Sequence, residues 1–308
     1  MSYLGNLTMR LAGGAMKLPE DFRRRHADYL RAAQRDDGGF AGRAGAGDLY
    51  YTGFALRGLA LLGMLDEPTA GRAAGFLRAR LDPVPPIVDF LSLVYSAVLL
   101  EMMAEIDVFA AAGVDRRQSV AAAVAPYRCA DAGCAKTPGG RHSSTYHTFL
   151  VALCRELAGV PPDDREPIVQ LVRSRRRADG GFVELAPLRQ GGTNPTAAAV
   201  SLLLLLDALD QPTAAGAAEF LAAMQNAEGG FRANTVIPVA DLLSTFTALV
   251  TLGDLGVVDR IDTGGVRAYV QSLENPGGGF RGGAWDDAAD VEYTFYGAGT
   301  LALLTATG

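Results

Sequence analysis

The sequence predicts an all-α fold, an α6/α6 toroid of six helix hairpins with apolar helices inside and amphipathic helices outside. Three observations predict this fold. A Gly-Gly-Phe mark recurs: Phe182, Phe231 and Phe280 are spaced by 49 residues, and Phe40 lies about three periods earlier. The hydrophobic residues between these marks follow the helical period. A threonine that opens an apolar run recurs with nearly the same spacing, at Thr52, Thr148, Thr196, Thr245 and Thr294.

Each repeat combines an amphipathic outer helix, a glycine turn and an inner helix that is apolar on nearly every side. Residues 19–34 and 241–252 exemplify the two helix types. The Gly-Gly pair suits a chain reversal with positive φ, and Asp48, Asp241 and Asp290 stand at N-cap positions, four residues before a repeat threonine. Inner helices of this kind must be shielded on all sides, so we expect a closed ring rather than an open stack. The expected elements are twelve helices and no sheet.

Two units depart from these marks. In the third, Asp131-Ala132-Gly133-Cys134 replaces the Gly-Gly-Phe, with Cys134 in place of the aromatic ring. In the second, the turn has decayed near the proline-rich residues 81–87, and Asp89 marks the unit. We expect residues 1–308 to form a single toroid domain, with residues 1–18 as an N-terminal extension.

Composition narrows the class of protein. The net charge of −6 gives no overall basic field for binding nucleic acid. The basic run of Arg173 and residues 175–177 is expected to be a solvated helix end. No unbroken apolar stretch reaches about 18 residues, so no membrane insertion is expected. Three cysteines form no disulfide framework, and the N-terminus lacks a signal-peptide layout, which predicts a cytoplasmic location.

Residues 34–40 and 225–231, each followed by an inner helix, resemble the repeats of the protein prenyltransferase β subunits and the squalene/oxidosqualene cyclases. The resemblance covers nearly the whole chain. It implies a bacterial-type relative that binds an isoprenoid or prenyl diphosphate in a central apolar cavity, with transfer of the prenyl group to an acceptor as the implied activity. Two alternatives remain: a terpene cyclase, and a non-catalytic lipid-binding or interaction module. Because the β subunits work against a helical α partner, we expect this chain to form a homodimer.

The metal site of the β subunits is only partly matched. They hold zinc through Asp-x-Cys on the fifth inner helix and a histidine on the sixth. Here Asp241 matches the aspartate, but Leu243 and Tyr293 stand at the other two positions, which predicts no zinc site of this type. Residues 286–290 have the Asp-Asp-x-x-Asp spelling that class I terpene synthases use to bind magnesium. Magnesium is therefore one candidate cofactor, and the alternative is that this spelling is a coincidence in an acidic loop. Zinc is a candidate only through the third repeat, and neither metal is required. Asp241 and Asp290 are candidate catalytic residues.

The third unit is richest in reactive side chains. Residues 146–148 read Tyr-His-Thr, the tripeptide of the β-subunit zinc histidine, but on the third inner helix. His147 is a candidate general base or phosphate ligand. The expected headgroup site around it comprises Lys136, Arg141, His142 and Tyr146. The alternatives are ordinary packing and a structural zinc site, whose ligand types would be right but whose spacing fits no standard finger, formed by Cys129, Cys134, His142 and His147.

Aromatic residues gather in the first and sixth units. On inner helices they could line an isoprenoid chain, or stabilise a carbocation through cation–π attraction. The alternative is that they are core residues. The candidates for contact with substrate are Tyr50, Tyr51, Tyr293, Tyr296 and Trp285.

Overall fold

The computed structural model describes residues 2–162 and 165–306. Within these residues the chain forms thirteen α-helices and two antiparallel pairs of two-residue strands. The predicted all-α class is confirmed. The expectation of no sheet is corrected by the two short pairs, in which Phe231 lies opposite Asp241 and Phe280 opposite Asp290. The phenylalanine and aspartate marks of the repeat therefore share a period because they are cross-strand neighbours.

The chain divides into two compact units. One comprises residues 1–123, 153–160 and 273–308, and the other comprises residues 124–152 and 161–272. The elements of the first are α1 (Tyr3–Ala15), α2 (Glu20–Ala32), α3 (Leu49–Leu61), α4 (Glu67–Arg78), α5 (Ile87–Ala104), α6 (Arg116–Val124) up to Ala123, β3 (Phe280–Arg281), β4 (Ala289–Asp290) and α13 (Val291–Ala306). The second contains α7 (Thr145–Leu157) up to Ala152, α8 (Arg165–Ser174), α9 (Thr193–Leu205), α10 (Gln211–Ala222), β1 (Phe231–Arg232), β2 (Ala240–Asp241), α11 (Leu242–Asp254) and α12 (Thr263–Ser272).

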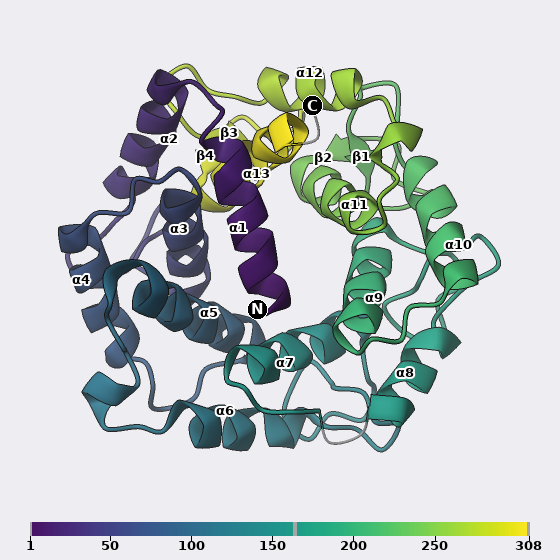
Figure 1. Cartoon of the computed structure of the whole chain (residues 1–308), viewed down its shortest axis with the longest axis horizontal. Helices are drawn as coiled ribbons and strands as arrows, with labels where there is room; N and C mark the ends of the chain where they lie inside the picture. The colour runs from purple at the N-terminus through teal and green to yellow at the C-terminus, as the bar shows by residue number, and fades with distance from the viewer. Residues whose placement is uncertain (1, 163–164, 307–308) are drawn as a thin grey trace. The chain divides into compact units, whose positions relative to one another are not determined.

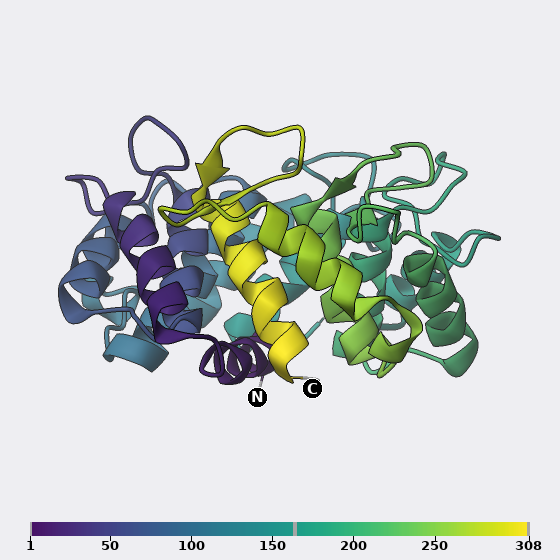
Figure 2. The same cartoon turned by 90° about the horizontal axis from the view of Figure 1, so that it is seen from above.

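In the first unit, the apolar helix α3 packs between α5 and α13. The segment expected to be an N-terminal extension contains α1, which crosses α13 and packs against it (Figures 1 and 2). Their contact is close because Gly14 has no side chain, and a Cβ there would lie 2.1 Å from the Ala302 carbonyl oxygen. The Thr305 hydroxyl also donates to the Gly14 carbonyl (2.8 Å). Helix α1 is therefore an integrated part of this unit.

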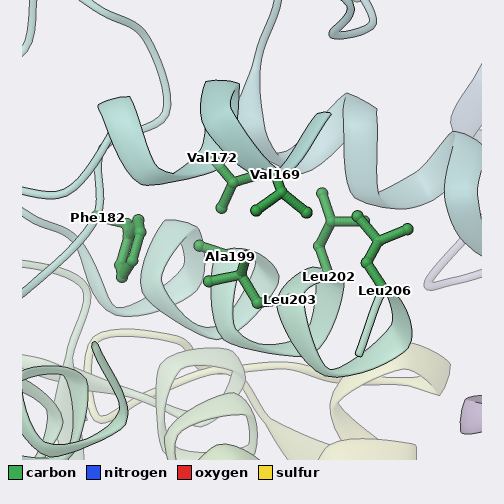
Figure 3. Close-up of a cluster of buried hydrophobic side chains, with 7 residues drawn as sticks. All are labelled: Val169, Val172, Phe182, Ala199, Leu202, Leu203 and Leu206. Atoms are coloured by element: carbon green, nitrogen blue, oxygen red, sulfur yellow. The ribbon is translucent and has the colours of Figure 1, made fainter. Parts of the chain in front are cut away.

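The second unit shows how an amphipathic helix covers an apolar one. Helix α8 turns Val169 and Val172, three residues apart, toward α9, and Phe182 from the following turn packs beside them (Figure 3). The residues of α9 in this cluster are Ala199, Leu202 and Leu203, and Leu206 joins them just beyond the helix. This arrangement is the hairpin that the sequence period predicts.

The turns follow one hydrogen-bonding plan. The first glycine of each Gly-Gly-Phe has positive φ, as predicted: +86° at Gly38 and Gly180. Each phenylalanine is fully buried, and its N–H donates to the hydroxyl of the repeat threonine, as Phe182 does to Thr196 (2.9 Å). In the third turn the positive φ falls on Ala132, while the Cys134 N–H keeps the bond to Thr148 (2.9 Å). The threonine mark is thus the acceptor for an otherwise unpaired buried donor.

Helix α5 is the longest helix in the described part of the chain. Of the described residues, only Ile87–Ala104 forms a helix long and apolar enough to cross a membrane, and 56% of it is buried within the protein. It packs against α3 and α4. Asp89 lies in its first turn, and its N-cap is Pro86.

Candidate functional site

The start of α7 brings together a serine, a histidine and a glutamate. The Ser144 hydroxyl oxygen accepts a hydrogen bond from the backbone N–H of His147 (3.0 Å), which caps the helix. The same oxygen lies 2.6 Å from His147 Nδ1 and donates its proton to Glu184 Oε1. Glu184 Oε2 accepts from the Tyr146 N–H (3.3 Å). All four residues belong to the second unit.

The electrostatics keep the His147 ring neutral. Burial lowers the pKa of His147; the negative charge of Glu184 opposes this effect, and the positive charge of Lys136 adds to it. The side chain is 12% exposed, so solvent still reaches it. At neutral pH His147 is therefore a neutral imidazole, the form that a general base requires.

The predicted headgroup cations lie on the loop before α7. Lys136, Arg141 and His142 are exposed, and none of them makes a hydrogen bond or ion pair with another described residue. Tyr146 is 40% exposed. The N–H groups at the start of α7, however, already have acceptors in Ser144 and Glu184. An anion at this helix end would have to compete with the Glu184 carboxylate.

The two cysteines of the third repeat, Cys129 and Cys134, are buried among protein atoms. Cys129 Sγ donates to the Gly140 carbonyl (3.4 Å), and burial raises the pKa of its thiol. Cys134 is 7% exposed in the position that phenylalanine holds elsewhere. Among the described residues no three His, Cys, Asp or Glu side chains are placed to hold a metal ion together. The alternative zinc set of Cys129, Cys134, His142 and His147 does not form such a group.

The two candidate catalytic aspartates cap helices. Asp241 accepts from the Ser244 N–H (2.7 Å) and hydroxyl (2.8 Å), and Asp290 accepts from the Tyr293 N–H (2.9 Å). Burial raises the pKa of both carboxyls. The guanidinium of Arg43 forms ion pairs with Asp286 and with Asp290 (3.5 Å), so an arginine compensates the charge of the Asp-Asp-x-x-Asp segment.

Aromatic candidates of α3 and α13 lie near the carboxyl of Glu292 and the guanidinium of Arg57. Tyr50 donates to Glu292 Oε1 (2.7 Å), and burial is the main effect that raises the pKa of this carboxyl. The Phe54 ring centroid lies 4.9 Å from that of Tyr50 and 5.2 Å from that of Tyr296. The guanidinium carbon of Arg57 lies 4.0 Å from the Phe54 centroid and 5.1 Å from the Phe295 centroid. A carboxyl, a guanidinium and several rings therefore meet in this unit.

The remaining aromatic candidates have simpler surroundings. Tyr51 packs over Gly42 and Tyr293 over Gly282, where an added Cβ would lie 2.5 Å and 2.6 Å from the respective rings. Trp285 is 59% exposed. The glycines in these two turns thus leave room for a tyrosine.

Sequence reasoning missed Glu184 and Arg57. Arg57 is the only charged residue of Leu49–Leu61, and that isolation was the available signal. Glu184 follows the repeat phenylalanine by two residues, where the other Gly-Gly-Phe units have Gly42, Ala233 and Gly282. The basic run was wrongly interpreted at Arg175, which is 4% exposed and donates to the Ser143 hydroxyl (2.7 Å) instead of lying in solvent.

Comparison with known proteins gives a family and several structural neighbours. The family model described as a prenyltransferase alpha-alpha toroid domain matches residues 8–89 and 141–308. Its gap, residues 90–140, coincides with the region where the repeat marks are degenerate. No curated protein matches the sequence.

Among solved structures, Candida albicans protein geranylgeranyltransferase-I complexed with GGPP has a TM-score of 0.71 at 13% identity, covering 91% of this chain and 90% of that chain. A protein from Actinoplanes has a TM-score of 0.60 at 18% identity, covering 94% and 100%. A variant of the type II terpene cyclase MstE from Scytonema, in complex with geranylgeranyl dihydroxybenzoate, has a TM-score of 0.59 at 16% identity, covering 98% and 97%. At these identities the likeness shows the fold.

Proposed function

We propose, from the premise that this chain belongs to the prenyltransferase alpha-alpha toroid family, that it binds an isoprenoid or a prenyl diphosphate and transfers the prenyl group to an acceptor. Membership of the family confirms the predicted toroid. The named ligands of two neighbours, GGPP and geranylgeranyl dihydroxybenzoate, support an isoprenoid as the ligand class.

One observation carries the proposal: in the apolar helices α7 and α13, polar groups gather in the first turn and the following turns are mainly apolar. In α7 the first turn holds Tyr146 and His147, and in α13 it holds Glu292 and Tyr293. Beyond those turns the helices continue mainly with Phe, Leu, Val, Ala and Gly. An amphiphile with a polar end and an apolar chain matches this distribution of side chains.

The proposed roles follow the sequence predictions. The diphosphate is bound by Lys136 and Arg141, which are exposed cations with unused donors, and His147 serves the acceptor. Separately, Tyr50, Tyr51, Tyr293, Tyr296 and Trp285, all in the compact unit that contains α3 and α13, are proposed to contact an isoprenoid chain. Asp241 and Asp290 are proposed as catalytic residues that also cap helices, because each accepts a backbone N–H in the first turn of its helix.

Calorimetric titration with farnesyl diphosphate tests the proposal. The wild type is expected to bind, and Arg141→Ala to bind about tenfold or more weakly, because a charge-assisted hydrogen bond contributes roughly 1.5–3 kcal/mol. Arg24→Ala, which removes an exposed arginine of α2, is the matched control and is expected to bind like the wild type. An equal loss of affinity in both variants would contradict the headgroup site, and a wild type that does not bind would end the isoprenoid proposal.

A second candidate function, terpene cyclisation, is favoured by the Glu292 carboxyl. A carboxyl with a raised pKa beside aromatic rings can donate a proton and lies near groups that stabilise a carbocation. Arg57, however, already places a positive charge on two of these rings, which opposes a second cation there. Product analysis after incubation with geranylgeranyl diphosphate separates the functions: a cyclised product supports the cyclase, and binding without any product supports a non-catalytic module.

We also propose a homodimer in the cytoplasm, the state that the sequence predicts for a β-subunit relative acting alone. Light scattering is the direct measurement. A mass near twice 32.3 kDa is expected, and a monomer at tens of micromolar concentration would contradict it.

A further inference from the structure

The hydrogen bonds of Ser144 fix the tautomer of His147. A serine hydroxyl offers one proton and two lone pairs. Its proton goes to the Glu184 carboxylate, which has none to give, and one lone pair accepts the His147 backbone N–H. The third neighbour, His147 Nδ1 at 2.6 Å, must then be a donor. The ring therefore carries its hydrogen on Nδ1 and its lone pair on Nε2.

The lone pair on Nε2 is available for chemistry. No described residue makes a hydrogen bond to this atom, and it is not among the buried side-chain nitrogens and oxygens that lack a partner. Solvent or a ligand can thus reach it. Nδ1 lies 3.9 Å from Glu184 Oε1, so a positive charge formed on the ring would be stabilised by the carboxylate.

The fold does not need these three side chains. At α9, Thr193 makes the same backbone contacts as Thr145 at α7: its N–H donates to the Ala233 carbonyl (2.9 Å), as that of Thr145 donates to the Glu184 carbonyl (3.1 Å). The places of Ser144, His147 and Glu184 are taken there by Gly192, Pro195 and Ala233. An inner helix of this protein can therefore begin without a serine, a histidine and a glutamate that are hydrogen-bonded to one another. We call the group of Ser144, His147 and Glu184 the relay, and its presence at α7 is explained by chemistry rather than by folding.

We propose that Ser144 and Glu184 are positioning residues that hold His147 with its lone pair on Nε2, where it takes the proton of the acceptor during prenyl transfer. This inference rests on the proposed function. As the acceptor thiol or hydroxyl attacks the first prenyl carbon, the new carbon–heteroatom bond forms and the carbon–oxygen bond to diphosphate breaks. Diphosphate leaves with the electron pair, and the acceptor proton moves to Nε2.

Nitrogen NMR of the free protein reads the tautomer without any substrate. The chain has three histidines, so the His147 signals are assigned by their loss in His147→Gln. His26 is an internal reference of opposite tautomer, because its Nδ1 accepts the Gly279 N–H (3.0 Å) and Nε2 faces Glu274 (3.1 Å). We expect hydrogen on Nδ1 of His147, lost in favour of Nε2–H in Ser144→Gly. A wild-type His147 with hydrogen on Nε2 would overturn the proposal.

The charged neighbours give a test with opposite signs. Glu184→Gln keeps an acceptor for the serine but removes the charge that raises the pKa of His147, so its titration midpoint should fall. Lys136→Met removes the charge that lowers this pKa, so the midpoint should rise. Glu166→Gln, which removes an exposed carboxylate from α8, is the control and should leave the titration midpoint of His147 unchanged. Shifts of equal sign in the first two variants would contradict the relay.

Turnover tests the base itself. With farnesyl diphosphate and dithiothreitol as a thiol acceptor, His147→Gln should release diphosphate about 10²–10⁴-fold more slowly than the wild type. The acidic limb of the kcat/KM profile should shift down in Glu184→Gln and up in Lys136→Met. An unchanged rate in His147→Gln, or a wild type that binds the substrate without turnover, would overturn the base role. A wild type that does not bind farnesyl diphosphate would instead overturn the proposed function, and the NMR tautomer would still decide the relay.

Discussion

The starts of α7 and α9 share one backbone design and differ in chemistry. In both, a threonine hydroxyl donates to a carbonyl of the following turn: Thr145 to Val183 (2.7 Å) and Thr193 to Arg232 (2.5 Å). In both, the repeat threonine accepts the buried N–H of its own turn, Thr148 from Cys134 and Thr196 from Phe182 (2.9 Å each). Only α7 adds a serine, a histidine and a glutamate. The repeats therefore share one pattern of backbone and threonine hydrogen bonds, and single repeats add reactive side chains to it.

The turn of the sixth repeat also differs from the other turns in its hydrogen bonds. Gln34 and Gln225 each donate to the carbonyl of the positive-φ glycine in their own turn, at 3.0 Å and 2.9 Å. Glu274 stands at the corresponding place in the sixth turn and cannot donate. It instead faces the ring of His26, which accepts the Gly279 N–H. A buried histidine thus accepts the N–H of the second turn glycine, as Asp37 accepts that of Gly39 (3.0 Å) in the first turn.

The largest expected effect tests the packing that differs between the third and fourth turns. Phe182→Ala should lower the free energy of unfolding by about 3–5 kcal/mol, because the ring is fully buried against α8 and α9. Cys134→Ala, at the same place in the third turn, should cost only about 1 kcal/mol because fewer buried atoms are lost. Urea denaturation measures both, and equal costs would show that the two turns are packed alike.

His26 of α2, which contacts the sixth turn, predicts a pH dependence of stability. Burial lowers the pKa of His26 from 6.5 to about 4. The unfolded chain therefore binds the proton more readily, and the stability contributed by neutral His26 is full above pH 6.5 and is lost as the pH falls toward 4. The loss should be on the order of 3 kcal/mol at pH 4.

His26→Val is the matched variant, because Val266 holds the corresponding position in α12. Denaturation at several pH values should show a shallower slope between pH 4 and 6.5 for this variant. Identical slopes would mean that other groups cause the acid instability.

A smaller effect tests the carboxylate at the start of α7. Glu184→Ala should destabilise the protein by about 1 kcal/mol, because the Tyr146 N–H loses its acceptor and the helix start loses a negative charge. The loss should shrink at high salt, since part of it is electrostatic. Glu166→Ala, in the first turn of α8, serves as the comparison. A salt-independent loss would assign the effect to hydrogen bonding alone.

The smallest expected effect on stability comes from introducing the serine, histidine and glutamate of α7 at the corresponding positions of α9. The triple variant Gly192→Ser, Pro195→His and Ala233→Glu should change the free energy of unfolding by less than about 0.5 kcal/mol, because serine improves on a glycine cap by only a few tenths. NMR should detect a fourth histidine with hydrogen on Nδ1. Hydrogen on Nε2 would show that the relay needs more of its surroundings than these three residues.

The sequence by itself determined the repeat, and with it the helices, the turns and the caps. These features are local to one hairpin. The positive φ belongs to Gly180 alone, and the hydrogen bonds from Phe182 to Thr196 and from Ser244 to Asp241 join residues that are close in sequence. Their period is visible without a structure. His147 could also be singled out, because residues 146–148 repeat the Tyr-His-Thr tripeptide of the β-subunit zinc histidine.

Only the tertiary structure decided which side chains meet across hairpins. Glu184 reaches Ser144 over 40 residues, and Glu274 reaches His26 over 248. Arg57 rests on rings from its own helix and from α13, and Arg175 is buried against the preceding turn. Hydrophobic periodicity specifies which face of a helix is buried, but a single polar residue carries no period, so its partner is set by how the hairpins stack.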